Sequence, residues 1–371
     1  MSKHPPSNIL DNQVKTVAVT GLHRGENPQP GAAVVASLRR RFPELRIVGL
    51  SYDPLESSLY SVYGDHPDIA YLMPYPGAGP DALFKRLEEI LEKEDIAFII
   101  PCLDLEIPNF MAIASKLLKK GVHCTLPTKD SLESVSKSNL YKLSQELGIS
   151  APRTESAMDL FTLETIANEI GYPVYVKGIF YEAHIANTIE ELIDASKEIS
   201  RVWGWPLLVQ EAIAGEEYDV VGLADGDGGI IKSCAVRKFQ RSSIGKGFAG
   251  IVVEDPELDR IAQRIIKKLS WNGPFELEFL KAPGSTHTLL EINPRFPAWV
   301  DFPSQIGCNL PGRLIENLTG AKQTPLGTCT AGQMFVRHCV DLVGDVSELA
   351  EMSSNGERAI TPYKTLLKAT Q

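Results

Sequence analysis

The first third of the sequence alternates short apolar strands with amphipathic helices. Runs such as VKTVAVTG, LRIVGLSYD and IAFIIPC are typical of strands, and the segment PDALFKRLEEILEKED has clear helical spacing. Strands that alternate with helices form a parallel sheet covered on both faces, because each return of the chain needs a crossover helix. We therefore expect a Rossmann-like α/β domain over residues 14–128, preceded by a flexible tail over residues 1–13.

The chain changes to an α+β pattern after residue 128. A helical stretch ends at Gly148, and the later strands, among them PVYVKG, LLVQEAI and EEYDVVGLAD, are joined by short turns typical of antiparallel pairs. We expect one domain of two α+β lobes over residues 129–320, with the smaller lobe at about 155–212. Residues 321–371 are predicted to form a C-terminal extension with at least one strand, QMFVRHCVDLV.

Two segments near the end of this domain, FELEFL and LLEINPRF, each combine an apolar face with a charged face. Because strand side chains alternate, the two glutamates of FELEFL should share one face and its phenylalanines the other. In the second segment Glu291, Asn293 and Arg295 should point one way while Leu290 and Ile292 point the other. Taken alone, such a polar face could be a solvated strand edge.

The turn residues between these segments, APGST, predict an antiparallel hairpin. If its loop is residues 283–286, Glu278 lies directly opposite Glu291. Two opposed carboxylates repel each other unless a cation lies between them, which argues against the solvated edge. The oxygen ligands of Glu278, Glu291 and Asn293 suit Mg²⁺ better than zinc, which prefers histidine or cysteine.

Other charged residues could complete a site for a phosphorylated ligand. Lys177 ends the apolar strand PVYVK, where it needs a charged partner or must reach the surface. Lys137 precedes a helix and would by itself be an ordinary surface lysine. Glu211 ends a strand and Glu217 follows a turn at Gly215, so this strand edge can offer backbone groups to a planar base and a carboxylate to ribose.

Composition narrows the classes of partner and location. The net charge is −10 without a dense Lys/Arg run, so nucleic acid and anionic membranes are poor candidate partners. The 6 cysteines form no CxxC pair, which favours free thiols in a reducing cytoplasm. The polar N-terminus has no apolar leader, and the chain has no apolar run long enough to span a membrane.

Together these segments resemble the ATP-grasp superfamily, particularly its members related to biotin carboxylase and to the large subunit of carbamoyl phosphate synthetase. The resemblance runs from about residue 14 to 320. It rests on FELEF with LLEINPRF, on VQEAIAGEEYDV, and on LPTKDSLESVSKSNLYKLSQELGISAPRT leading to PVYVKG. It implies a pre-ATP-grasp domain followed by an ATP-grasp domain whose two lobes hold ATP, with one or two Mg²⁺ or Mn²⁺ ions.

The resemblance also implies roles for individual residues. Lys137 and Lys177 match the family's two phosphate-binding lysines, and Glu217 matches the ribose-binding carboxylate. Glu278, Glu291 and Asn293 match the metal ligands, and Arg295 matches the arginine that meets the transferred phosphate or the acceptor carboxylate. The adenine-binding hinge is matched by Gln210, Glu211, Ala212 and Ile213.

One departure from the family pattern concerns the loop that covers the phosphates. The stretch GIFYEAHIANT after Lys177 has a single glycine, where the family usually has a glycine-rich loop. The later stretch RKFQRSSIGKGFAG, with Arg237, Lys238 and Lys246, could take over this role through backbone amides and a lysine. It could equally be an exposed hairpin loop.

The activity that the resemblance implies is an ATP-dependent carboxylate–amine ligase. It would phosphorylate a small-molecule or peptide carboxylate and join the acyl phosphate to an amine, releasing ADP and phosphate. Phosphoryl transfer or carboxylation at the same site, or a regulatory or scaffold protein with reduced catalysis, are the alternatives. Related enzymes are commonly homodimers.

The acceptor pocket has less distinctive candidates. In an open α/β sheet, ligands bind beyond the carboxyl ends of the strands, which is where Asp104 and Glu106 follow IAFII. They could hold an amine or cap the next helix. Trp299 and Asp301, in RFPAWVDFP, would line the acceptor side if the segment after the hairpin packs over the metal site.

Overall fold

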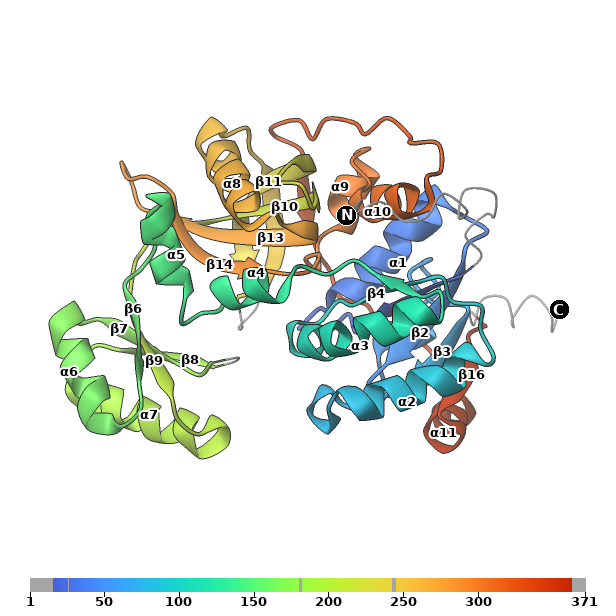
Figure 1. Ribbon diagram of the computed structural model, residues 1–371, viewed down its shortest axis with the longest axis horizontal. Coiled ribbons are helices and arrows are strands. Elements are labelled where there is room, and N and C mark those ends of the chain that lie inside the picture. Colours follow the sequence, from blue (N-terminus) through green and yellow to red (C-terminus); the bar gives the residue numbers. More distant parts are fainter. Residues whose placement is uncertain (1–15, 26, 180–181, 242–244, 362–371) are drawn as a thin grey trace.

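The computed structural model describes residues 16–361, except 26, 180–181 and 242–244 (Figure 1). These residues form three sheets: two with six strands and one with four. The smallest sheet and its helices make a separate lobe, seen at the left of Figure 1, and the two larger sheets lie in the remainder of the molecule.

The N-terminal sheet is parallel in its first five strands, as expected from the strand–helix alternation. Their spatial order is β3-β2-β1-β4-β5. The strands are β1 (Thr16–Thr20), β2 (Arg46–Ser51), β3 (Ile69–Leu72), β4 (Phe98–Ile100) and β5 (His123–Cys124).

Helices cover both faces of this sheet because both sets of alternating strand residues are apolar. Val17 and Val19 pack in the same cluster as Val34 and Leu38 of α1 (Pro30–Arg41). The opposite face packs against α2 (Pro80–Leu91) and α3 (Ile107–Lys119). Short 3-10 turns lie between these elements, at Ser57–Tyr60, Pro76–Ala78 and Asp104–Glu106.

The central sheet is antiparallel, with the order β14-β13-β10-β11-β12-β15. Its first five strands along the chain are β10 (Glu216–Asp225), β11 (Ile230–Arg241), β12 (Gly247–Val252), β13 (Asn272–Lys281) and β14 (Thr288–Asn293). One face packs on α5 (Leu140–Leu147) and α8 (Pro256–Leu269). The other face packs toward α9 (Asp301–Gln305), α10 (Leu310–Thr319) and the N-terminal sheet.

The helical stretch predicted to end at Gly148 is interrupted. It forms α4 (Lys129–Ser134) and α5, and Lys137 lies in the turn between them. Gly148 does end α5, with a left-handed φ of 56° that a glycine adopts without steric cost.

The small lobe is called here the lid lobe. Its elements run from residue 154 to residue 211, where the sequence predicts a smaller lobe at about 155–212. Its strand order is β6-β9-β7-β8. Helices α6 (Leu160–Ile170) and α7 (Ile189–Trp203) share a core of their own with this sheet. The strands are β6 (Thr154–Ala157), β7 (Val174–Lys177), β8 (Ala183–Ala186) and β9 (Leu207–Glu211).

The C-terminal segment contributes one edge strand to each of the two larger sheets. The predicted strand QMFVRHCVDLV is reduced to β15 (Met334–Val336), which pairs with β12. A helix that was not predicted, α11 (Val346–Asn355), leads into β16 (Glu357–Ala359), which pairs antiparallel with β3. The extension is therefore built into both sheets.

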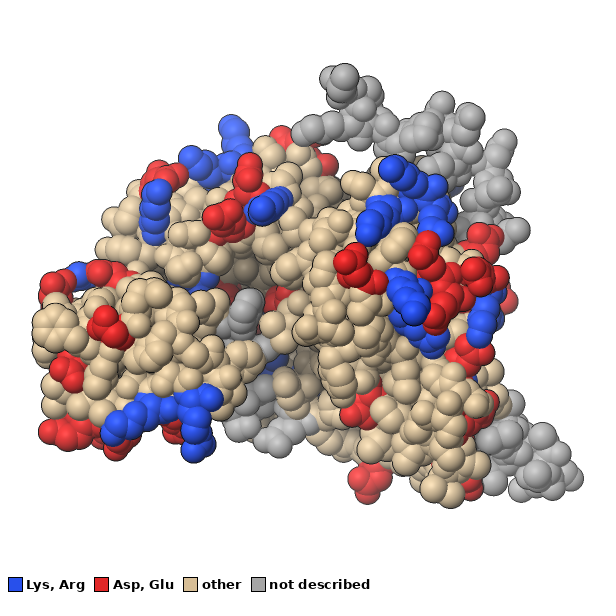
Figure 2. All heavy atoms as spheres, turned by 60° about the horizontal axis from the view of Figure 1, so that its bottom comes forward, with Lys and Arg blue, Asp and Glu red and all other residues tan. Residues whose placement is uncertain are grey.

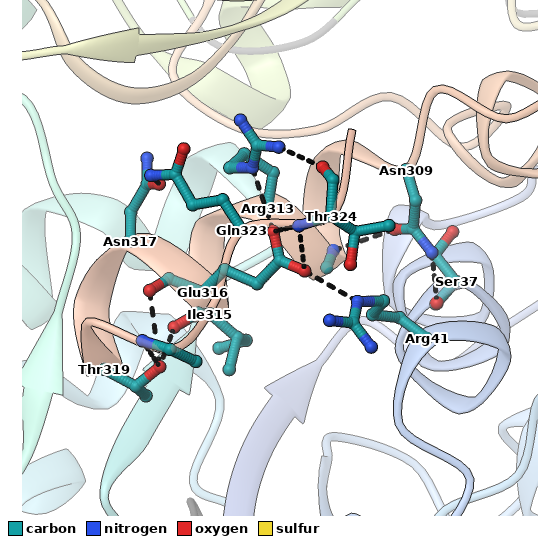
Figure 3. A network of polar contacts seen from close by, with 12 residues as sticks. Ser37, Arg41, Asn309, Arg313, Ile315, Glu316, Asn317, Thr319, Gln323 and Thr324 are labelled. Atoms are coloured by element: carbon teal, nitrogen blue, oxygen red, sulfur yellow. Dashed lines mark hydrogen bonds and ion pairs between the residues drawn. The ribbon is translucent and has the colours of Figure 1, made fainter. Parts of the chain in front are cut away.

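The N-terminal and central sheets share one hydrophobic cluster, which contains residues of β1, α1, β10, β11 and α10. A polar network reinforces this junction (Figure 3). The buried Glu316 of α10 accepts hydrogen bonds from Arg41 of α1 at 2.6 Å, from Arg313 at 2.9 Å and from the Thr324 amide. The boundary predicted near residue 128 therefore lies between two sheets, but these two sheets share one hydrophobic cluster.

Two expectations from composition can be compared with the structure. All six cysteines are free thiols, and four of them are buried. Among the described residues, every helix is too short or too polar to cross a membrane.

Candidate functional site

Three carboxylates form a row across neighbouring strands of the central sheet. Glu278 of β13 pairs with Glu291 of β14, as predicted from the sequence. On its other side Glu278 pairs with Asp219 of β10, which was not predicted. Because cross-strand partners point to the same face, the three side chains lie side by side. Such a row of like charges is unfavourable unless cations lie against it.

The hairpin reaches this register by a different route from the predicted one. Glu278 pairs with Glu291 but Phe279 pairs with Leu289, so Leu290 is an extra bulge residue without a partner. The strands are joined by residues 282–287 rather than by 283–286. Leu290 was expected to face the core, but Leu289 takes this position together with Ile292.

Lys238 of β11 is the cation that balances the row. Its Nζ lies 2.9 Å from Asp219, 3.0 Å from Glu278 and 3.5 Å from Glu217, and its side chain is only 5% exposed. Burial opposes its charge, but the surrounding carboxylates raise the pKa of Lys238 well above its usual value. Burial likewise works to raise the pKa of Glu278, yet Lys238 outweighs it and holds that pKa at about 2.

A second buried group, centred on Glu276, holds several predicted site residues in place. Glu276 accepts a hydrogen bond from Arg295 at 2.6 Å, from the Asn293 amide at 3.0 Å and from the Trp299 indole at 3.3 Å. Arg295 also bonds Asp104 at 3.1 Å. Despite burial, these carboxylates raise the pKa of Arg295. Glu276 was predicted only to share a face with Glu278, and its role as an anchor is new.

The predicted phosphate lysines approach the hairpin from other elements. Lys137 Nζ, in the α4–α5 turn, lies 3.8 Å from Glu291 Oε1. Lys177 ends β7 in the lid lobe, and burial is the main cause that lowers its pKa to about 8. Glu291 opposes this shift and Lys137 adds to it, so the two lysines and Glu291 share one electrostatic environment.

Lys246 turns into the same region. It lines a small cavity of about 20 Å³ together with Lys238, Glu278, Arg295 and Trp299. The like charge of Arg295, followed by burial, lowers the pKa of Lys246. This position favours the phosphate-loop interpretation over an exposed hairpin loop, although residues 242–244 of that loop lie outside the described part of the chain. Figure 2 shows a hollow between the lid lobe and the remainder of the molecule, with charged side chains visible inside it.

The predicted metal ligands have the chemistry that a hard divalent cation requires. Glu278 and Glu291 present adjacent carboxylates. The Asn293 amide nitrogen donates to Glu276 and Glu278, which leaves its oxygen as the remaining ligand atom. Burial raises the pKa of the Glu291 carboxyl group. Because that side chain is 38% exposed, solvent screens part of this effect. These three residues therefore fit Mg²⁺.

The predicted nucleotide hinge lies where β9 leaves the lid lobe. Gln210 is buried and donates to the Thr154 hydroxyl at 2.8 Å. The amide of Glu211 donates to the Arg153 carbonyl and that of Ala212 to the Pro173 carbonyl. These contacts hold the hinge backbone, and an adenine would use its other polar groups. Ile213 follows in the segment that enters the central sheet.

Glu217, the predicted ribose carboxylate, is tied to two cations. It lies 3.5 Å from Lys238 and forms an ion pair with Arg241. Its side chain is 16% exposed, so part of the carboxylate remains accessible.

The structure corrects the expected positions of Arg237 and Asp301. Arg237 neighbours Lys238 on β11 and therefore points to the opposite face, where it bonds Glu216 at 3.0 Å. Asp301 begins α9 and contacts Ser37 at 3.2 Å and Arg40 at 3.3 Å, both in α1. Neither side chain reaches the carboxylate row.

Glu106 is likewise removed from the expected acceptor pocket. It is fully buried, accepts the amides of Cys102 at 2.7 Å and Leu103 at 2.9 Å, and receives hydrogen bonds from Thr20 and Tyr52. Of the two interpretations, these contacts favour the capping role. Its neighbour Asp104, in contrast, does reach Arg295.

Asp219 and Lys238 are the principal site residues that sequence reasoning missed. Lys238 was noted only beside Arg237, and Asp219 lies in an ordinary strand sequence. The signal that could have found them is strand alternation, which puts Asp219 on the face of Glu217 and Lys238 on the face opposite to Arg237.

Comparison with known proteins gives a family match and a set of curated relatives. Residues 205–337 match the family described as ATP-grasp in the biosynthetic pathway with Ter operon. The carbamoyl phosphate synthase arginine-specific large chain of Bacillus subtilis (strain 168) is 25% identical over 307 residues, which are 75% of this chain and 29% of that protein. The chain thus spans less than a third of this relative.

Two solved structures have the same fold. The biotin carboxylase domain of a 2-oxoglutarate carboxylase from Hydrogenobacter thermophilus, a dimer bound to MgADP, ADP and bicarbonate, has a TM-score of 0.64 at 18% identity, covering 84% of this chain and 71% of that one. An L-amino acid ligase from Bacillus licheniformis has a TM-score of 0.62 at 14% identity, covering 82% and 74%. At these identities the likeness establishes the fold.

Proposed function

Because the chain carries an ATP-grasp domain, we propose that it is an ATP-dependent carboxylate–amine ligase that acts on an amino acid or small peptide. Most support comes from one observation: Lys137 and Lys177, from two different segments, converge on the Glu278–Glu291 pair of the hairpin. Cations facing a carboxylate pair across an interlobe space are the arrangement that a metal-bound polyphosphate requires.

The proposed site works by positioning and by charge neutralisation. When bound, Mg²⁺ on Glu278, Glu291 and Asn293 would neutralise phosphate charge. Lys137, Lys177 and Lys246 bind the phosphate oxygens of ATP, and the hinge over residues 210–213 and Glu217 hold its base and ribose.

Arg295 orients the acceptor carboxylate and the migrating phosphoryl group. Glu276 fixes the guanidinium from one side, and Asp104 bonds it from the other. The carboxylate oxygen attacks the γ-phosphorus and ADP leaves. An amine then displaces phosphate from the acyl phosphate, forming the amide bond and losing one proton. Asp104, 38% exposed, can accept that proton. It can also hold the incoming group as an ammonium ion, which must lose a further proton to water before the neutral amine attacks.

The proposal extends to a cytoplasmic homodimer, which the description of one solved neighbour as a dimer supports. Two alternatives use the same site differently. Carboxylation is suggested by the bicarbonate bound in that neighbour. A regulatory protein with reduced catalysis is suggested by the single glycine in the stretch after Lys177.

The direct test incubates the full chain with Mg²⁺-ATP and pools of amino acids and dipeptides and measures ADP, phosphate, AMP and condensed products. ADP and phosphate in step with an amide product support the ligase. AMP with pyrophosphate excludes the acyl-phosphate route. Tight ATP binding without turnover supports the regulator.

The metal site is tested by Glu291→Gln, which keeps the shape of the side chain and removes its charge. We expect Mg²⁺-dependent turnover to fall at least about 100-fold while the protein stays folded, because charge stabilisation of phosphoryl transfer is lost. Glu216→Gln, an exposed position of β10, is the matched control. Equal turnover in both variants rejects the metal-site assignment.

A further inference from the structure

A second and larger cavity lies between the N-terminal sheet and the lid lobe. Its volume is about 350 Å³, within the range of about 300–1,000 Å³ typical of small-ligand pockets. One wall comes from the turn after β3 and the turn after β4, and the other from the segment after β7 and the end of α7. The described residues that line it are Pro76, Gly77, Leu105, Ile179, Trp203 and Pro206.

In the part of the chain that the structure describes, the walls of this cavity are apolar, and none of the six lining residues there has an ionisable side chain. Ile179 is 43% exposed and Trp203 is 42% exposed. A polar group bound here would lose hydrogen bonds to water without replacement, whereas an apolar group would remove apolar surface from water. The cavity therefore selects an apolar occupant.

Both walls adjoin the candidate active site through the chain itself. Leu105 directly follows Asp104, whose carboxylate bonds Arg295 at 3.1 Å. Ile179 lies two residues after Lys177. Since consecutive Cα atoms are about 3.8 Å apart, each wall begins within about 4 to 8 Å of a residue of the charged site.

We propose that this cavity binds the apolar side chain of the acceptor, so that the substrate is a carboxylate carrying a bulky aliphatic or aromatic group. The inference rests on the proposed ligase function. Arg295 holds the carboxylate at the charged end, and Leu105, Ile179 and Trp203 enclose the apolar end. One wall of the cavity belongs to the lid lobe and the other to the N-terminal domain. A bound side chain would therefore contact both parts of the molecule.

Binding, measured separately from turnover, tests this inference. Calorimetric titration of the full chain in Mg-ADP uses L-phenylalanine, L-leucine and 3-phenylpropanoate as apolar probes and L-aspartate as the polar probe. We expect at least one apolar probe to bind about tenfold or more tighter than L-aspartate, the discrimination typical of an apolar pocket. Equal affinities, or no binding by any apolar probe, overturn the inference.

Variants of the walls locate the binding. Leu105→Asn and Trp203→Ser should weaken the apolar probe about tenfold and leave the affinity for ADP unchanged. Phe161→Ala is the control, because Phe161 is an 80% exposed apolar residue on α6 of the same lobe. Unchanged probe affinity in both wall variants overturns the inference.

The same variants separate this inference from the ligase proposal. If apolar probes bind in a way that depends on Leu105 but no ADP forms from ATP, the ligase function is rejected and the apolar binding pocket is supported. If amides form only from polar acceptors and Leu105→Asn does not change this activity, the ligase function is supported and the apolar binding pocket is rejected.

Discussion

At the scale of single residues, neighbouring positions on β11 have opposite environments. Lys238 is enclosed by three carboxylates, while Arg237 pairs with Glu216 in solvent. Removing one partner from a buried charge group leaves the others uncompensated. We expect Lys238→Met to lower the free energy of unfolding by about 3–5 kcal/mol.

The adjacent Arg237→Met should cost about 0–1 kcal/mol, as is usual for an exposed ion pair. Urea unfolding of both variants at pH 7 measures the difference. Equal losses for the two would contradict the assignment of Lys238 as the central cation of the row.

The pH dependence of stability follows from Glu278. Its pKa is about 2 in the folded protein against an ordinary value of 4.5, so the stability it contributes is complete above pH 4.5 and is lost as the pH falls toward 2. Without Lys238, burial dominates and this carboxylate favours its protonated form. The stability gap between wild type and Lys238→Met should therefore narrow below pH 4.5, and denaturant midpoints across this range measure it. If the stability difference between wild type and Lys238→Met instead widened as the pH fell, the charged form of Glu278 would not be the stabilising form.

Lys177 predicts a pH dependence of nucleotide binding. With a pKa of about 8 it is charged below that pH and neutral above it. The affinity of the free protein for ATP should fall about tenfold for each pH unit above about 8, because the neutral amine no longer attracts phosphate.

Lys177→Arg should bind ATP with no such decline, since arginine stays protonated. Fluorescence titration with an ATP analogue between pH 7 and pH 9 measures the effect. Lys142→Arg, an exposed lysine of α5, should keep the wild-type profile. A flat profile in the wild type would exclude Lys177 as the titrating group.

At the scale of elements, the hairpin explains what the sequence could and could not predict. Glu278 and Glu291 are joined by one turn, so local alternation and turn residues were enough to pair them. The Leu290 bulge offsets a longer loop, and the two deviations cancel at the carboxylates. Strand alternation places Asp219 on the same face as Glu217, but it does not show which strand lies beside β10. Asp219 was missed because the pairing of β10 with β13 joins strands that are far apart along the chain.

The C-terminal helix α11 and strand β16 were missed for a related reason: they are short, and their stability comes from the surface that receives them. Met352 of α11 is fully buried in the core shared by the two larger sheets. Met352→Ala should lower the free energy of unfolding by about 2–5 kcal/mol.

Val346 begins the same helix but is 78% exposed. Val346→Ala should change the free energy of unfolding by about 0.5 kcal/mol or less. Thermal or urea unfolding of the pair measures both values. A mild effect at Met352 would mean that α11 docks only weakly.

At the scale of the whole molecule, the N-terminal and central sheets share a core while the lid lobe has its own. The residues of the candidate site come from both of these parts. The carboxylate row, Arg295 and Lys238 belong to the shared-core part, whereas Lys177 and the hinge belong to the lid lobe. A ligand held by both sets of residues would join the two parts of the molecule.

The pairing of β16 with β3 has a consequence for synthesis of the protein. The edge of the N-terminal sheet stays open until nearly the whole described chain has been translated, because its covering strand is the last of the described strands. Until then β3 exposes unpaired backbone groups that can pair with another chain. Released chains that end before residue 346 should therefore be cleaved by protease around β3 faster than the released full chain of 371 residues. Equal cleavage rates would mean that the sheet closes its edge without β16.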